Sequence, residues 1–218
     1  MSLNEILPGV FHWSAMYPKI GQVVHSHYWA PGRTVVDPLL PDEHSAVLDE
    51  LRERGVEQIV LSNRHHWRSS EEVRAAFGDA PVLCNDQGLY EFAADDGRDV
   101  EPFAVGSVLA PGMRAVEVGG ICDDDTGLLF DTAGGALLFA DALIIWDGRL
   151  AFVPDFLLGD PDKDKRNMLV AFRRLLDEHE FDNLLFAHGD PWIGGGRAAL
   201  QAFVDSGGWS AGNDAFEH

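Results

Sequence analysis

The segment from Leu61 to Arg68 constrains the fold more than any other part of the chain. It follows a short apolar run at 58–60 that is typical of a buried strand. It precedes Ser69 and Glu72, whose spacing is that of a helix-capping box. A strand, a polar loop rich in histidine and a helix are therefore predicted in succession. Loops at strand ends are where sheet proteins place ligand sites.

The remaining pattern alternates short β-rich runs with amphipathic helices. The residues predict strands and helices in two successive groups, which favours a mixed α/β protein with two face-to-face sheets and outer helices. Gly134-Gly135 indicates a tight hairpin, and the tail at 206–218 is expected to be loosely packed. The expected strands lie at about 9–13, 22–29, 33–36, 56–61, 81–84, 113–118, 127–130, 136–139 and 183–186, and the expected helices at about 43–54, 70–77, 162–179 and 196–205.

Length and composition set the class of protein. The chain has 218 residues, 46% of them hydrophobic, which is enough for a single domain over 1–218 with a full core. Its 16 basic and 36 acidic residues give a formal net charge of −20, which repels phosphate backbones and predicts no nucleic-acid partner. No apolar run approaches the ~20 residues of a membrane span. The absence of a signal-peptide pattern and the use of only two cysteines predict a cytoplasmic protein.

Other acidic, histidine and tryptophan residues are also candidates for a site. The acidic runs at 95–96 and 123–125 are expected to be solvated turns. His25 and His27 share one face of a strand and are expected to be half-exposed. Three tryptophans are interpreted as core or edge residues, with a role in lining a pocket as the alternative: Trp13, Trp29 and Trp67.

The order of several segments resembles the motifs of the metallo-β-lactamase-fold hydrolases. The segment 61–68 takes the place of their T-H-x-H-x-D-H motif, and 116–122 takes that of T-P-G-H-T. The segments 35–38, 138–143 and 186–190 resemble L-I-D-x-G, L-x-G-D-A-L and G-H-G. This resemblance covers most of the chain. It implies a four-layer αββα sandwich, that is, two mixed β-sheets flanked by helices.

The resemblance also implies a degenerate metal site. At the metal-holding positions the chain keeps His65, Asp141 and His188. The resemblance assigns His65 and His188 to two different metal positions, with Asp141 between them, and assigns His66 to a variable position that faces away. The other metal-holding positions carry Asn63, Trp67, Arg68 and Ile121. None of these four side chains is a usual zinc ligand, so dinuclear zinc hydrolysis of β-lactams or thioesters is not expected.

Two functions remain open from the sequence, and whether the protein is an enzyme is left open with them. In the first, Arg68 pairs with Asp141, no cofactor is bound, and the pocket holds a small anionic ligand or is vestigial. In the alternative, His65, Asp141 and His188 hold one zinc, iron or manganese ion that hydrolyses a small ester, thioester or lactone. The pocket is expected to comprise Asn63, His65, His66, Trp67, Arg68, Ile121, Asp141 and His188.

Overall fold

Two β-sheets form the centre of the protein in the computed structural model, which describes residues 2–41, 45–93 and 98–209. Seven strands make the first sheet in chain order: β1 (Asn4–Leu7), β2 (Val10–Tyr17), β3 (Gln22–Trp29), β4 (Thr34–Val36), β5 (Gln58–Val60), β6 (Val82–Asn85) and β7 (Glu101–Phe103). Five make the second, in the order β14 (Asn183–Phe186), β11 (Ala136–Phe139), β10 (Thr126–Phe130), β9 (Met113–Glu117) and β8 (Val108–Ala110). A separate hairpin joins β12 (Ile144–Trp146) to β13 (Arg149–Ala151).

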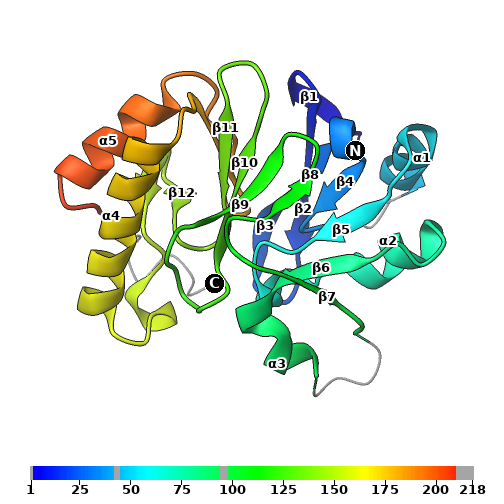
Figure 1. The fold of residues 1–218 in the computed structure, drawn as a ribbon, viewed down its shortest axis with the longest axis horizontal. Coiled ribbons are helices and arrows are strands. Elements are labelled where there is room, and N and C mark those ends of the chain that lie inside the picture. The colour runs from blue at the N-terminus through cyan, green and yellow to red at the C-terminus, as the bar shows by residue number, and fades with distance from the viewer. Residues whose placement is uncertain (1, 42–44, 94–97, 210–218) are drawn as a thin grey trace.

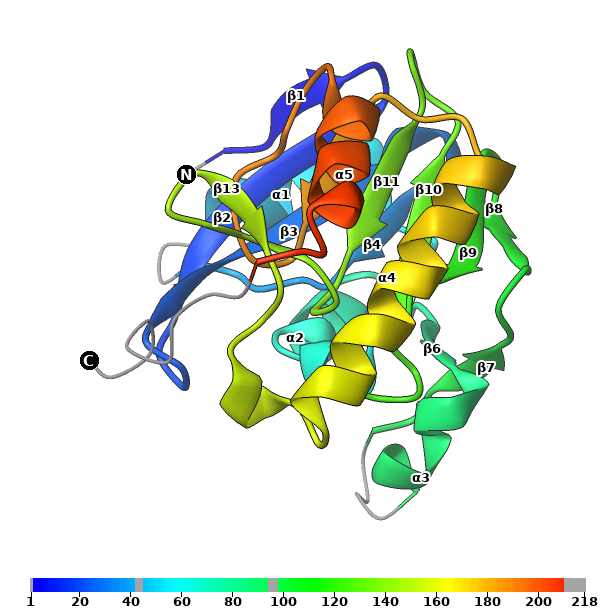
Figure 2. The same ribbon diagram turned by 90° about the vertical axis from the view of Figure 1, so that its left-hand side faces the viewer.

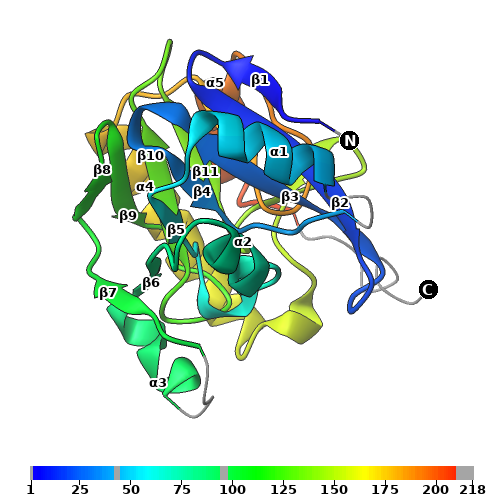
Figure 3. The ribbon, with the colours of Figure 1, turned by 90° about the vertical axis from the view of Figure 1, so that its right-hand side faces the viewer.

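Helices cover the outer face of each sheet. Figure 1 shows α1 (Ser45–Arg54) and α2 (Ser70–Ala76) outside the first sheet, and α4 (Pro161–Glu178) and α5 (Gly196–Asp205) outside the second. Figure 2 views the face carrying α4 and α5, and Figure 3 the face carrying α1 and α2. The short helix α3 (Leu89–Phe92) follows β6. The expected αββα sandwich is confirmed.

Apolar side chains fill the spaces between the layers. Val36 and Val60 of the first sheet and Leu128, Leu138 and Leu185 of the second belong to one cluster between the sheets. Separate clusters lie beneath the two outer helical layers. Strands buried on both faces need near-continuous apolar runs, which is why β11 and β14 read as ALLF and NLLF.

Two parallel strand pairs position the functional loops. β4 pairs in parallel with β5, and β11 with β14, so the carboxyl ends of each pair open at the same edge of their sheet. The main-chain amide of His25 donates to the carbonyl of Ala187 over 2.9 Å and joins the two sheets at this edge. The loops that follow β4, β5, β11 and β14 therefore meet in space.

Helix caps differ from the sequence prediction in two places. Ser69 Oγ does not cap α2 but accepts a 3.0 Å hydrogen bond from the amide of Leu40. The predicted capping box is therefore wrong. Asp160, which was not predicted as a helix cap, caps α4 by accepting a hydrogen bond from the amide of Lys163 over 3.1 Å.

The predicted β10–β11 hairpin is confirmed, and a side chain at its second glycine would collide. Gly134 and Gly135 both have positive φ. A Cβ at Gly135 would lie 2.7 Å from the carbonyl oxygen of Glu180.

The end of the described chain packs against the domain. The amide of Phe152 donates to the carbonyl of Trp209 over 2.7 Å. The tail that was expected to be loose, 206–218, is described only as far as 209, and 210–218 lies outside the described residues. None of the helices in the described part of the chain combines the length and hydropathy that crossing a bilayer requires.

Candidate functional site

Three side chains converge where the two sheets meet. His66 ends the 3-10 helix η2 (Arg64–His66) after β5, Asp141 follows β11, and His188 follows β14. Asp141 Oδ1 lies 3.1 Å from His188 Nε2, and Asp141 Oδ2 lies 3.4 Å from His66 Nε2. One ligand atom from each residue lies within 4.8 Å of the other two. This is the one such cluster of metal-ligating side chains among the described residues.

A second carboxylate orients His66. Asp37, in a left-handed backbone conformation just after β4, lies with Oδ2 3.0 Å from His66 Nδ1. Ser62 fixes Asp37 by donating its amide to Oδ1 over 2.8 Å and its hydroxyl to Oδ2. With Nδ1 held in this way, Nε2 is directed at Asp141. Carboxylate–histidine pairs of this kind fix ligand orientation in metal centres.

Asn63 makes hydrogen bonds that hold Asp141 and the η2 turn in place. Its side-chain Nδ2 donates to Asp141 Oδ2 over 2.6 Å, and its side-chain Oδ1 accepts from the main-chain amide of His65 over 3.0 Å. The second bond caps η2, and the turn that follows carries His66 inward. Asn63 is thus a fully buried structural partner of Asp141.

Electrostatics separate the two histidines. Burial and the charge of Arg68 oppose protonation of His66, but Asp37 and Asp141 outweigh them and raise its pKa to about 9. Burial lowers the pKa of His188, although Asp141 acts against this shift. Burial disfavours the charge on Asp141, yet His66 and His188 hold its pKa well below the usual range. The metal-free site therefore holds a cationic His66, a neutral His188 and an ionised Asp141 near neutral pH.

Arg68 does not pair with Asp141, so that prediction is wrong. Its Nη1 donates to the main-chain carbonyls of His25 and Asp37, each over 3.1 Å. Its Nε and Nη2 are buried and have no hydrogen-bond partner among the described residues. Arg68 is also one of the few non-glycine residues with positive φ, at 43°. The guanidinium therefore lies at the site without neutralising Asp141 directly.

The resemblance selected the wrong histidine of the His65-His66 pair. His65 is exposed, whereas His66 is 4% exposed and reaches Asp141. Trp67 is also not a pocket residue, because its ring packs against Phe92 with centroids 5.8 Å apart in the core beneath α2. On a tight 3-10 turn a change of one position moves a side chain to a different face, which a motif alignment does not detect.

A cavity of about 790 Å³ opens beside the cluster. Its polar lining residues are Lys19, Gln22, His65, His66, Arg68, Asp141 and His188. Its apolar side includes Tyr17, Pro18, Ile20, Ile121, Ile144, Val153, Phe156 and Leu157. A concave site with a few convergent polar groups and an apolar wall is the usual form of a small-molecule site.

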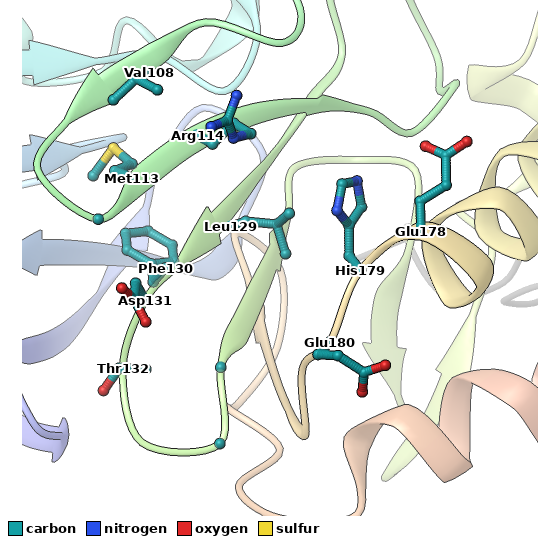
Figure 4. Close-up of a pocket in the computed structure, with 13 residues that line it drawn as sticks. Val108, Met113, Arg114, Leu129, Phe130, Asp131, Thr132, Glu178, His179 and Glu180 are labelled. Atoms are coloured by element: carbon teal, nitrogen blue, oxygen red, sulfur yellow. The ribbon is translucent and has the colours of Figure 1, made fainter.

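A second cavity, of about 640 Å³, lies away from this cluster. Figure 4 shows residues that line it, among them His179 and Glu180, which follow α4, and Leu129 and Asp131 of the β10–β11 hairpin. It shares no lining residue with the first cavity. The convergence of His66, Asp141 and His188 makes the first cavity the candidate site.

Two buried carboxylates in the 123–125 run were not predicted. Asp123 is exposed as expected, but Asp124 and Asp125 are buried, so the interpretation as solvated turns is wrong for both. Asp124 accepts from the amide and the guanidinium of Arg64. Asp125 lies beside Asp141, whose charge, after burial itself, raises the pKa of Asp125 well above its usual range. In the sequence, only the run of three aspartates at 123–125 marked this loop as unusual.

The β2–β3 hairpin carries a buried histidine cluster. His12 Nε2 and His25 Nδ1 are 2.8 Å apart, and the His12 and His27 ring centroids are 5.3 Å apart. His25 and His27 are 4% and 1% exposed, so the expectation that they are half-exposed is wrong. Trp13 and Trp29 are core residues whose ring nitrogens donate to main-chain carbonyls. Their interpretation as core residues is confirmed.

The residues present fit a single metal ion. In a tetrahedral zinc site with bonds of about 2.0–2.1 Å, neighbouring ligand atoms are about 3.3 Å apart. Asp141 presents Oδ1 to His188 Nε2 at 3.1 Å and Oδ2 to His66 Nε2 at 3.4 Å, and one ligand atom of each residue lies within 4.8 Å of the other two. Two imidazoles and one carboxylate are also the donor types that zinc accepts in open catalytic sites.

The sandwich and the site at its strand ends together define the metallo-β-lactamase fold. A metallo-β-lactamase from Pontibacter korlensis superposes with a TM-score of 0.68 at 16% identity, covering 94% of this chain and 97% of that one. Rubredoxin oxygen:oxidoreductase from Desulfovibrio gigas gives 0.65 at 11% identity, covering 94% of this chain. The present chain spans 61% of that protein's length. At these identities the likeness establishes the fold alone. No family model and no curated protein sequence matches the chain.

Proposed function

We propose that the protein is a mononuclear metal-dependent hydrolase, with His66, Asp141 and His188 as the protein ligands. The observation that carries this proposal is the convergence of these three side chains at metal-compatible separations, with His66 already oriented by Asp37. A divalent cation there supplies a Lewis acid and a source of hydroxide near neutral pH. A small ester, thioester or lactone is the substrate class that this chemistry suits.

We propose one cation rather than two because Asn63, Trp67 and Ile121, which stand at the other metal-holding positions of the resemblance, cannot ligate a second cation. The Asn63 amide group is already bonded to Asp141, and Trp67 lies in the core. Ile121 lines the cavity without offering a ligand atom. Arg68 donates to main-chain carbonyls and not to Asp141, so it does not take the place of a metal as the counter-ion of Asp141.

The test is the metal content of protein purified without chelator or added metal. About one zinc, iron or manganese ion per chain is expected by elemental mass spectrometry. His66→Gln should lose the ion, and the matched control His65→Gln should keep it, because His65 is exposed and is not one of the three clustered side chains. Metal-free parent protein that takes up no ion from a zinc titration would refute the proposal.

A small anion held without a metal remains the second candidate, and one specific observation favours it. A cationic His66, with a pKa of about 9, and Arg68 both line the cavity. A ligand carboxylate or phosphate would meet two positive charges there. Titration of chelator-treated protein with acetate and inorganic phosphate distinguishes the candidates. Saturable binding of either anion, in protein that takes up no zinc, would favour this alternative.

A further inference from the structure

Three large apolar side chains are exposed around the cavity beside the metal-ligand cluster. Ile20, at the tip of the β2–β3 hairpin, is 45% exposed, and Phe156 and Leu157 of the 3-10 helix η4 (Asp155–Leu157) are 58% and 42% exposed. All three line this cavity, as does buried Ile144, and they form an apolar wall. Single exposed apolar side chains are common, but a group of them that lines one concave site marks a ligand-binding surface.

Turns hold both sides of the apolar wall in place. At the hairpin tip, the amides of Ile20 and Gly21 donate to the carbonyl of Tyr17 over 3.2 and 2.9 Å. In η4, the amide of Leu157 donates to the carbonyl of Pro154 over 3.0 Å. Figures 2 and 3 show the hairpin tip and the segment between β13 and α4 at the same end of the molecule. The wall is therefore preformed, which lowers the entropy cost of binding a ligand.

The charged side chains of the cavity differ from those of the protein as a whole. The chain has 36 acidic and 16 basic residues. Among the described residues that line this cavity, however, Asp141 is the only acidic one, whereas Lys19 and Arg68 are basic. A ligand carboxylate, which most of the surface repels, is therefore favoured in this cavity.

We propose that the substrate carries a straight apolar acyl chain, which lies along the apolar wall while its carbonyl group lies at the three clustered metal ligands. This inference rests on the proposed function, because it names the substrate class of the same site. In the hydrolysis, the bond from the acyl carbon to oxygen or sulfur breaks and a bond to the oxygen of water forms. The leaving oxygen or sulfur takes a proton. The product is a straight-chain carboxylate, whose charge Lys19 and Arg68 complement.

Binding of such carboxylates by metal-free protein tests this inference without turnover. Chelator-treated protein is titrated with butyrate, hexanoate and octanoate, and the amide chemical shifts are followed by NMR. Affinity should rise about two- to fourfold with each added methylene group, because each one leaves water for the apolar wall. The largest shift changes should lie at Ile20 and Leu157, and not at Val108 and Leu129, which line the second cavity.

Two substitutions test the wall itself. Ile20→Ser and Leu157→Ser should each lower the ratio of octanoate affinity to butyrate affinity by about three- to tenfold. Both side chains are partly exposed, so both variants should melt close to the parent. Val170→Ser is the matched control, since Val170 is 61% exposed on α4 and lines neither cavity. It should keep the parental ratio within about twofold.

The outcomes separate this inference from the proposed function. Equal affinities for butyrate and octanoate would overturn the inference, and uptake of one zinc ion by the same protein would leave the proposed function intact. A rise in affinity with chain length in a protein that takes up no zinc would refute the hydrolase and retain the cavity as a site for acyl carboxylates. Dimerisation in sedimentation that Ile20→Ser or Leu157→Ser abolishes would also overturn the inference, because a second copy would then cover the apolar wall.

Discussion

Single side chains decide what this site can do. Asp141 contacts Asn63 and His66 from the loop after β5, and His188 from the loop after β14. The strand-end position of Asp141 and His188 is readable from the sequence, because both follow strongly apolar runs. The choice between His65 and His66 is not readable, because it depends on a 3-10 turn set by the Asn63 cap. Burial of Asp37 and Asp125 depends on contacts far along the chain, which local pattern does not encode.

The first residue-scale prediction concerns pH. The folded pKa of His66, about 9, lies above its unfolded value of about 6.5, so folding favours the protonated form. Its stabilising contribution, on the order of 3 kcal/mol, is fully present below pH ~6.5 and is lost as pH rises through about 9. Urea unfolding of metal-free protein should show this loss. His66→Gln should flatten the alkaline limb, and His65→Gln should leave it unchanged. An unaltered slope in His66→Gln would contradict the assignment.

The second concerns the backbone at Arg68. Arg68→Ala and Arg68→Gly both remove the bonds to the carbonyls of His25 and Asp37, so both should destabilise the protein. At φ 43° an alanine keeps the left-handed strain that glycine avoids. Arg68→Gly should therefore be more stable than Arg68→Ala by about 1 kcal/mol in chemical denaturation. Equal stabilities would mean that the backbone relaxes once the side chain is lost.

Whole elements differ in how far the sequence predicts them. α5, β11 and β14 lie at the predicted residues because their apolar spacing is clear and their ends are marked by glycine or polar residues. β7, β8, β12 and β13 have three residues each and were not predicted, since so short a run carries no readable period. The β2–β3 hairpin was predicted as strands, but its histidines were expected to be half-exposed.

The hairpin gives a prediction at the scale of the element. Both ring nitrogens of His27 are buried without a partner among the described residues. His27→Leu removes these unsatisfied groups and should leave stability at neutral pH equal or higher. Burial holds the pKa of His27 well below 6.5, so its contribution is present above that pH and is lost as pH falls.

Denaturation from pH 7 to pH 4 tests this expectation. His27→Leu should weaken the acid dependence of stability, with exposed His65→Leu as the control. A loss of more than about 1 kcal/mol at neutral pH would show that the imidazole has a hidden partner.

At the scale of the molecule, apolar periodicity predicted a mixed α/β protein with two packed sheets, and the motif resemblance predicted the four-layer sandwich. Two groups of strands with helices outside were predictable from apolar periodicity, and the pairing of β4 with β5 and of β11 with β14 then brings the loops together. At this scale the prediction concerns linkage between metal and stability. Zinc at about 100 times its dissociation constant should stabilise the parent by about 2.7 kcal/mol. For a chain of this size the melting temperature should rise by roughly 5–10 °C.

Thermal unfolding with zinc and with chelator measures this shift. His66→Gln should show no zinc-dependent rise, whereas His65→Gln should behave like the parent. A rise of equal size in both variants would place the bound zinc elsewhere on the protein.

The position of the site, where the two sheets meet, has a consequence for the mechanical stability of the protein. His66 belongs to the loops of the first sheet and Asp141 to those of the second, and the Asn63–Asp141 bond alone joins positions 78 residues apart. An ion held there would be a reversible cross-link that closes a long loop, as a disulfide does, but one governed by the supply of metal. Separation of the two sheets during unfolding would then require the ion to dissociate first. Resistance to proteolysis would follow metal availability in the surroundings, independently of any catalytic turnover.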